Sequence, residues 1–201
     1  MPASACGPVL VASRCAVRIS RITRVVATER EAPGAEGFFM AFDASEQEHV
    51  ARALGRIPSG CSILTVVAGD RRTGVLVSWV QQAAFEPPMV SVGVKKGRPA
   101  VALIDESRQF VLNLLGENPS AMFKHFGRGF ALEDDAFAGL AIESVPGGLA
   151  IPGRIARLSV AVRQKVDAGD HWLYVGEIID ADGGAEGAKP YVHLRKNGLS
   201  Y

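Results

Sequence analysis

The chain has 201 residues, of which 48% are hydrophobic and 21% charged, an ordinary composition for one globular domain with a short extension. Its formal net charge of +1 gives no basic field that would indicate nucleic acid as a partner, and no apolar run reaches the roughly 18 residues of a membrane helix. The three cysteines, Cys6, Cys15 and Cys61, form no close-spaced pair, which argues against a disulfide framework or a metal site and favours a reducing compartment.

The N-terminal segment differs from the rest of the chain. Residues 1–28 contain four arginines and no acidic residue, a composition that resembles an organelle transit peptide. A misassigned start codon is the alternative, because Met40 directly precedes a helix signal. We therefore treat residues 1–39 as an extension and assign the domain to residues 40–201. The protein is expected in the cytoplasm, or in a chloroplast or mitochondrion if the extension is a transit peptide.

The sequence of the first half of the domain predicts one helix and three strands. Ser45 and Glu48 match the S-x-x-E capping box of a short helix that ends at Gly55. Two β-branched runs, CSILTVVAG and TGVLVSWV, then predict a hairpin around the polar turn GDRRTG. The next strand, PMVSVGV, is entered through Glu86-Pro87-Pro88, where proline is incompatible with a helix interior and confines the strand's first residue.

The second half continues the mainly β pattern. In chain order it predicts a helix in GRPAVALIDES, a strand QFVLNLL, a helix over residues 118–127, a loop over residues 145–153, long strands RLSVAVRQKV and HWLYVGEIIDA, and a final short strand or arm, PYVHLRKNGLSY. About seven closely spaced strands without regular alternation with helices argue against a parallel doubly wound sheet. We expect an antiparallel barrel, closed or partly split, with a few peripheral helices.

Several common site motifs are missing. The sequence contains no G-x-G-x-x-G after a strand, no P-loop, no G-x-S-x-G and no H-E-x-x-H. A Rossmann or P-loop nucleotide site, a nucleophile elbow and a zinc-protease site are therefore not supported, and no metal site is expected.

Polar clusters instead stand near the ends of predicted strands and on one helix: SWVQQ, KKGRP, KHF, GDH and HLRKNG. Strand ends converge in a barrel, so these clusters could line one mouth. Their chemistry suits a phosphorylated aromatic cofactor. Small hydroxyls such as Ser78 can bond ring carbonyls or phosphate, and Trp79 and Phe126 can cover a flat ring. Lys95, Lys96 and Arg98 flank a glycine turn and a helix start, which suits a phosphate.

Each cluster also has a structural interpretation. SWVQQ, including Gln82, could simply end a strand with one packed tryptophan, and KKGR could be a solvated loop. Asn113 needs a partner if it is buried, and a structural hydrogen bond is as plausible as a contact to the cofactor. His125 could lie on the surface, and Asp170 and His171 could serve only the hairpin turn. His193, Arg195 and Lys196 could belong to an exposed tail or to a site or interface.

Taken in order, LGRIPSG, GVLVSWVQQAAFEPPMVSVGV, FVLNLL, KHF and GDHWLYVGEI resemble the flavin reductase-like family, whose fold is the FMN-binding split barrel. With the closing H-x-RK-x-G-x-x-Y, the pattern most resembles the C-terminal flavin reductase module of cyanobacterial-type flavodiiron proteins. The resemblance implies an antiparallel Greek-key split barrel that forms a homodimer. It also implies FMN, with FAD less favoured, bound non-covalently near the interface and reduced by NADPH or NADH.

The resemblance implies a set of site residues as well. His171, in the GDH motif, is the expected nicotinamide contact, and no side chain is expected to act as an acid or base. Trp79 replaces the second small hydroxyl residue that is common in the family. The cofactor-binding set is Ser78, Trp79, Val80, Gln81, Lys95, Lys96, Arg98, Asn113, His125 and Phe126.

The leading functional hypothesis is an NAD(P)H-dependent flavin oxidoreductase, because hydride transfer between two cofactors requires positioning more than acid–base chemistry. The alternative is an FMN-binding electron-transfer module that a partner protein reduces. A weaker third hypothesis is an oxidase on a similar barrel, which would need a substrate pocket.

Overall fold

The computed structural model describes residues 42–199, and the compact unit of the chain begins at Glu46. The interpretation of residues 1–39 as a transit peptide or a misassigned start lies outside the described residues and stays a prediction. None of the helices in the described part is long and apolar enough to cross a membrane.

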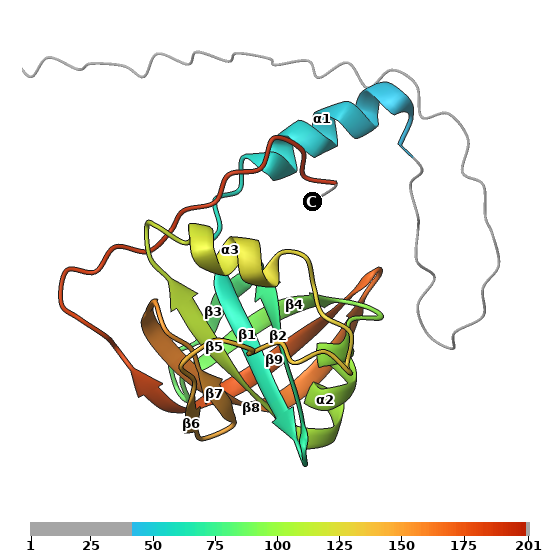
Figure 1. Ribbon diagram of the computed structural model, residues 1–201. Helices are drawn as coiled ribbons and strands as arrows, with labels where there is room; N and C mark the ends of the chain where they lie inside the picture. Colours follow the sequence, from blue (N-terminus) through green and yellow to red (C-terminus); the bar gives the residue numbers. More distant parts are fainter. Residues whose placement is uncertain (1–41, 200–201) are drawn as a thin grey trace, which may run out of the picture. The chain divides into compact units, whose positions relative to one another are not determined.

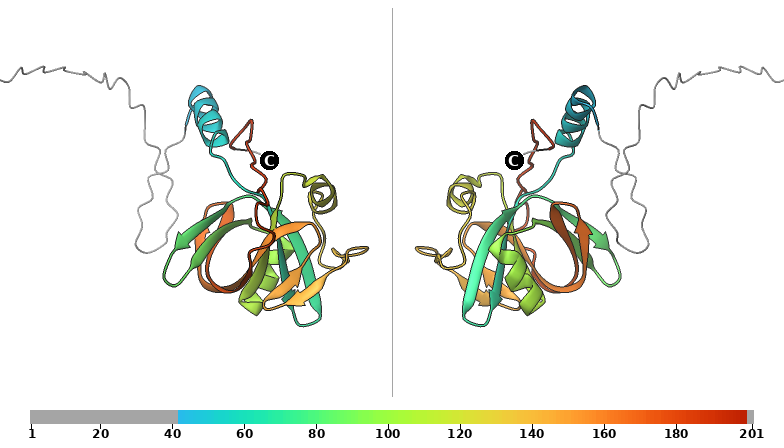
Figure 2. Two further views of the ribbon diagram at one scale, coloured as in Figure 1. Left: turned by 90° about the vertical axis from the view of Figure 1, so that its left-hand side faces the viewer. Right: turned by 90° about the vertical axis from the view of Figure 1, so that its right-hand side faces the viewer.

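The domain is built on one curled antiparallel sheet, which Figures 1 and 2 show from three sides. Its seven strands are adjacent in the order β2-β1-β5-β8-β9-β4-β3, and all of the pairs between them are antiparallel. This confirms the predicted mainly β, antiparallel split-barrel architecture. The strands are β1 (Ser62–Ala68), β2 (Arg71–Val77), β3 (Val80–Ala84), β4 (Met89–Lys95), β5 (Gln109–Leu115), β8 (Arg154–Ala168) and β9 (His171–Asp182).

Three hairpins supply most of the sheet. β1 and β2 turn at Gly69 and Asp70, β3 and β4 turn over residues 85–88, and β8 and β9 turn at Gly169 and Asp170. Long-range pairing joins the hairpins, because β4 pairs with β9 and β5 bridges β1 to β8. The pairing of β4 with β9 is the part of the topology that brings distant polar motifs together.

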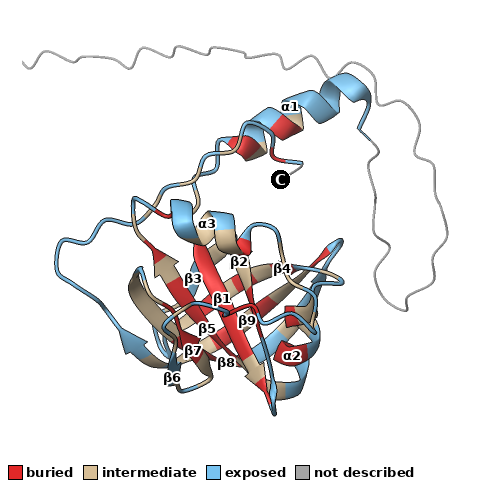
Figure 3. Cartoon of the chain, viewed as in Figure 1, coloured by how far each residue is buried: buried red, intermediate tan, exposed pale blue. Residues whose placement is uncertain are grey.

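Helix α2 (Pro99–Ser107) closes one side of the barrel core. Proline occupies its first turn, where no backbone donor is needed, and Arg108 ends it in the left-handed region at φ 58°. Its buried face consists of Ala100, Leu103 and Ile104. These side chains join the inward-facing valines of β4 and aromatic residues of β5 and β9 in the main core (Figure 3).

A second hydrophobic cluster lies under helix α3 (Ser120–Phe126). It contains Ile63 of β1 and Leu115 of β5, whereas Leu64 and Leu112 of the same strands belong to the main core. Both faces of these two central strands are therefore covered, which explains their almost continuous apolar sequences.

The structure corrects three details of the sequence prediction. The Ser45–Glu48 capping box is wrong, because α1 (Ala44–Gly55) begins after Asp43, whose carboxylate accepts hydrogen bonds from Ser45 N and Oγ at 2.8 and 2.9 Å. The polar stretch VQQAA is strand β3 rather than the end of a strand. The predicted loop over residues 145–153 contains part of a small hairpin, β6 (Glu143–Val145) and β7 (Gly148–Ala150).

Candidate functional site

Trp79 lies on the outer face of the sheet, between β2 and β3. In β4, the side chains of Val90, Val92 and Val94 are buried in the core, so alternation directs Gly93 outward. Gly93 N donates a hydrogen bond to Trp79 O at 2.9 Å, and a Cβ built on Gly93 would lie 3.0 Å from Trp79 Cε3. The missing side chain of Gly93 therefore lets the indole pack directly on the strand.

His171 meets Trp79 from the neighbouring strand. It opens β9, opposite Lys95 of β4, and its ring centroid lies 4.4 Å from that of Trp79 with the planes tilted by 43°. Only 3% of His171 is exposed, whereas Trp79 is 37% exposed. We call Trp79, Gly93 and His171 the aromatic shelf.

Asp170 fixes the orientation of the His171 ring. Its Oδ1 lies 2.7 Å from His171 Nδ1. This hydrogen bond is the main reason that the pKa of Asp170 lies below its ordinary value. An ionised carboxylate can only accept, so Nδ1 carries the proton in this pair. The imidazole is thus held by a hydrogen bond on one edge and by the indole at its face.

A third motif reaches the shelf from the extended segment 191–199. The guanidinium carbon of Arg195 lies 5.3 Å from the centroid of the Trp79 ring. SWVQQ, GDH and HLRKNG, which are far apart in the sequence, therefore contribute one side chain each to the same place. Because Lys95 is also adjacent in the register, two cations and one carboxylate surround the shelf.

The KKGR cluster does not act as one unit. Lys96 Nζ bonds both carboxylate oxygens of Asp167 at 2.8 Å, which lowers the pKa of Asp167, and lies 4.4 Å from the Trp172 ring centroid. Arg98 is exposed and its guanidinium lies against Gly129. Of the predicted phosphate contacts, Lys95 is the one next to the shelf.

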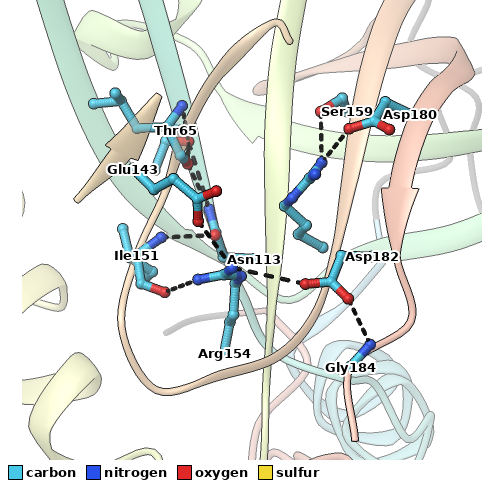
Figure 4. Close-up of polar contacts among 11 residues, drawn as sticks. Thr65, Asn113, Glu143, Ile151, Arg154, Ser159, Asp180, Asp182 and Gly184 are labelled. Atoms are coloured by element: carbon cyan, nitrogen blue, oxygen red, sulfur yellow. Dashed lines mark hydrogen bonds and ion pairs between the residues drawn. The ribbon is translucent and has the colours of Figure 1, made fainter. Parts of the chain in front are cut away.

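Asn113 has the structural role that was the alternative to a flavin contact (Figure 4). Its side chain is fully buried, donates to Ile63 O and Leu149 O at 3.2 and 3.1 Å, and accepts from Ile151 N at 3.0 Å. These bonds join β1 and β5 to the β6–β7 hairpin. Since all of its polar atoms are engaged and none is accessible, Asn113 is not part of the site that we propose.

The two α3 residues also lie away from the shelf. Phe126 is 1% exposed in the second cluster, where its ring packs on Gly74. His125 Nε2 is 2.9 Å from Ala136 O, and the residue borders a shallow hollow of about 370 Å³ with Lys124 and Arg128. We therefore leave both out of the proposed site, because Phe126 cannot cover a ligand ring from the core.

The remaining SWVQQ residues divide between two environments. Ser78 is half-buried beside Trp79, and Gln81 and Gln82 are exposed on β3. Val80 packs against the main core, so its side chain does not face the shelf. Ser78 and Gln81 remain candidates, while a contact from Val80 could come only from its backbone.

A cavity lies elsewhere in the domain. It has a volume of about 650 Å³ and is bordered by the β1–β2 turn, the end of α2 and the β6–β7 hairpin. None of the residues predicted for the site lines it. No cluster of three or more potential metal ligands occurs within residues 42–199. Neither this cavity nor the hollow beside His125 is lined by Trp79, Gly93 or His171.

Besides Asp170, for which the sequence suggested a turn role, two residues of this region were not in the predicted binding set. Gly93 looked like an ordinary member of a strand, although a glycine inside a strand can indicate the close approach of another group. Arg195 was assigned to either a tail or a site. Nothing in the local sequence shows that residues 191–199 return to the indole.

Comparison with known proteins places the chain in a family. The model of the flavin reductase like domain matches residues 54–198. A relative named putative diflavin flavoprotein A 3, from Synechocystis sp., is 35% identical over 163 residues, covering 80% of this chain and 27% of the relative. The chain thus spans about a quarter of the length of the curated relatives it matches.

Solved structures share the fold. The NADH:FAD oxidoreductase SgcE6 of Streptomyces globisporus C-1027 superposes with a TM-score of 0.69 at 21% identity, covering 78% of this chain and 93% of that one. Nitrilotriacetate monooxygenase component B from Mycobacterium thermoresistibile gives 0.66 at 26% identity, with 76% and 85% covered. Family match, relatives and fold agree: the chain belongs to the flavin reductase-like family.

Proposed function

We propose that the protein is an NAD(P)H-dependent flavin oxidoreductase that binds FMN non-covalently at the aromatic shelf. The observation that carries this proposal is the convergence of Trp79, His171 and Arg195 on one outer face of the sheet. No turn or core requirement explains why an exposed indole, a fixed imidazole and a guanidinium should meet there.

The residues of the shelf fit a planar, phosphorylated cofactor. Trp79 offers an exposed aromatic ring, which packs on the buried His171 ring and on the bare backbone of Gly93. Lys95 and Arg195 supply positive charge for a phosphate. Ser78 and Gln81 add polar groups at the edge. FMN carries one phosphate and a single planar ring system, so we favour it over FAD.

The chain's own part in the reaction is to bind and orient. Bound FMN would supply the hydride-accepting ring position, which no protein side chain offers. Asp170 holds the His171 imidazole in one orientation. We assign His171 to contact the nicotinamide in a conformation in which Trp79 has moved aside, because His171 is only 3% exposed beneath the indole. Trp79 and Gly93 set the depth at which a ring can approach the sheet. Such positioning accounts for a site without a catalytic base.

The first test is an absorption spectrum of the purified full chain, reconstituted with FMN without oxygen, before and after addition of NADPH or NADH. Bleaching of the flavin band at a catalytic rate is the expected result. A second measurement concerns His171→Ala, which should raise the KM for the nicotinamide while the dissociation constant of FMN changes little. An unchanged KM would contradict the role of His171.

A second candidate function has its own support. The curated relatives are named diflavin flavoproteins and are about four times as long as the matched segment, so this domain occurs there with other domains. The protein could likewise be an FMN-binding electron-transfer module that a redox partner reduces. In the same spectrum, FMN would then bind but its band would persist after NADPH or NADH is added.

We also propose a homodimer in which a second copy covers the region of the shelf. The shelf lies on an open sheet face, and two exposed aromatic residues flank strand β3: Trp79 at 37% and Phe85 at 89% exposure. β3 is an edge strand of the sheet. Light scattering during size-exclusion chromatography should give twice the monomer mass. A monomer that binds FMN with full affinity would refute this arrangement.

A further inference from the structure

The segment 191–199, which we call the strap, is tied down along its length. Tyr191 N donates to Leu115 O at 3.0 Å, and His193 and Ser59 exchange two backbone hydrogen bonds of 2.7 and 3.1 Å. Further along, Gly198 N donates to Ala51 O of α1 at 2.8 Å. The strap and α1 consequently run side by side (Figures 1 and 2).

Two glycines fix the strap at Arg195. A Cβ on Gly55 would lie 2.5 Å from Arg195 O, and a Cβ on Gly198 would collide with Leu54. Arg195 N also donates to Gly55 O at 3.2 Å. The backbone that carries the guanidinium is therefore held closely against the end of α1, unlike that of a loosely attached tail.

Within the described residues 42–199, the Arg195 side chain has one polar contact. Its Nη1 donates to Gly198 O at 3.3 Å, while its guanidinium carbon lies near the Trp79 ring. Among residues 42–199 it forms no ion pair, in contrast to Lys96, Arg157 and Arg163, each of which bonds a carboxylate. A guanidinium has five N–H donors in a planar fork that matches phosphate oxygens. Most of these donors remain for a ligand.

We propose that Arg195 recognises a phosphate monoester on a ligand bound at the aromatic shelf. This inference rests on the proposed flavin site and deepens it, because it assigns the residue that distinguishes phosphorylated from unphosphorylated ligands. Two ligands of the proposed reaction carry such a group: FMN, compared with riboflavin, and NADPH, compared with NADH. The strap is then part of the binding site.

The test compares the full-length wild type with Arg195→Gln, which removes the charge and the fork. Dissociation constants of FMN and riboflavin are measured by flavin fluorescence, and KM values of NADPH and NADH by steady-state oxidation. We expect one phosphorylated ligand to bind roughly 10- to 100-fold more weakly, the effect of losing a charge-assisted hydrogen bond. Its unphosphorylated counterpart should be unaffected. The pair that changes identifies the source of the phosphate.

Lys196→Gln is the matched control, because it removes the same charge one residue along, from an exposed side chain. The dissociation constants of FMN and riboflavin and the KM values of NADPH and NADH should stay within about twofold of wild type, as expected for a solvated surface charge. Arg195→Lys should recover only part of the preference, since lysine keeps the charge but loses the fork.

Two other outcomes would overturn the inference, and they differ in what else they overturn. In the first, Arg195→Gln weakens the binding of phosphorylated and unphosphorylated ligands equally, or changes the binding of neither. In that case Arg195 only supports Trp79 or the strap, and the flavin site stands. If the wild type binds neither FMN nor riboflavin, the proposed function itself fails, and the role of Arg195 fails with it.

Discussion

Replacing Asn113 by leucine tests whether this residue supports the fold or contacts a flavin. Leucine has the same branched shape, although its methyl groups are bulkier than the amide, and it cannot form the hydrogen bonds of the amide to Ile63 O, Leu149 O and Ile151 N. Leu149 O would keep its bond from Thr65 Oγ1 at 2.5 Å, whereas Ile151 N–H would lose its acceptor. The substitution therefore leaves the buried backbone N–H of Ile151 without an acceptor.

The expected cost follows from those contacts. A buried donor without a partner costs about 1–3 kcal/mol, and each further lost bond about 0.5–1.5 kcal/mol. A total of about 3 kcal/mol corresponds to a melting temperature lower by roughly 6–12 °C in a domain of this size. The variant should still fold, because domains are typically stable by about 5–15 kcal/mol.

The assay is thermal unfolding followed by circular dichroism, with FMN affinity measured at a temperature where the variant is fully folded. Gln109→Leu is the control, since it makes the same amide-to-leucine change on β5 at a half-buried position. It should shift stability by less than about 0.5 kcal/mol. A variant of Asn113 with an unchanged melting temperature but weakened FMN binding would refute our assignment.

Three other changes probe the shelf and the core. Gly93→Val places a Cβ 3.0 Å from Trp79 Cε3, so FMN titration should show roughly tenfold weaker binding, about the effect of Trp79→Ala, while Ser91→Val on the same face changes little. Asp170→Asn removes the acceptor that orients the imidazole and should raise the KM for the nicotinamide more than it lowers kcat. Burial raises the pKa of Cys61 from 9.0 to about 11, so with the other cysteines replaced by serine the thiol should resist alkylation at pH 8 until the protein unfolds. The stabilisation linked to this neutral thiol is present below pH 9 and lost as the pH rises towards 11, which urea midpoints can measure.

Sequence patterns predicted the elements that have two covered faces or clear ends. The run QFVLNLL corresponds to β5, and proline after a glycine turn marks the start of α2. Strand β3 was missed because it lies at the sheet edge with Gln81, Gln82 and Ala83 exposed, which removes the alternation of polar and apolar residues. Edge strands of this kind carry little signal in a single sequence.

The site was harder to predict for a different reason. Alternation shows which residues of one strand share a face, but it does not show which strands become neighbours. The contact between Trp79 and His171 depends on the pairing of β4 with β9, which closes over a long stretch of chain. The burial of Phe126 could not be predicted either, because only the three-dimensional packing reveals that the bare backbone of Gly74 admits its ring to the core.

Along β4 and β9, residues that stabilise the core alternate with residues that belong to the proposed ligand site. Val92 and Tyr174 face the core, while Gly93 and His171 belong to the outer face. A complete substitution scan of these strands should give two interleaved profiles with a period of two. Substitutions at inward-facing positions should lower protein abundance. Substitutions at outward-facing positions should lower the affinity for flavin or nicotinamide while the protein stays well folded. Insertion of one residue before Gly93 would turn the residues of β4 that follow it to the opposite face, and would exchange the selective constraints on those positions.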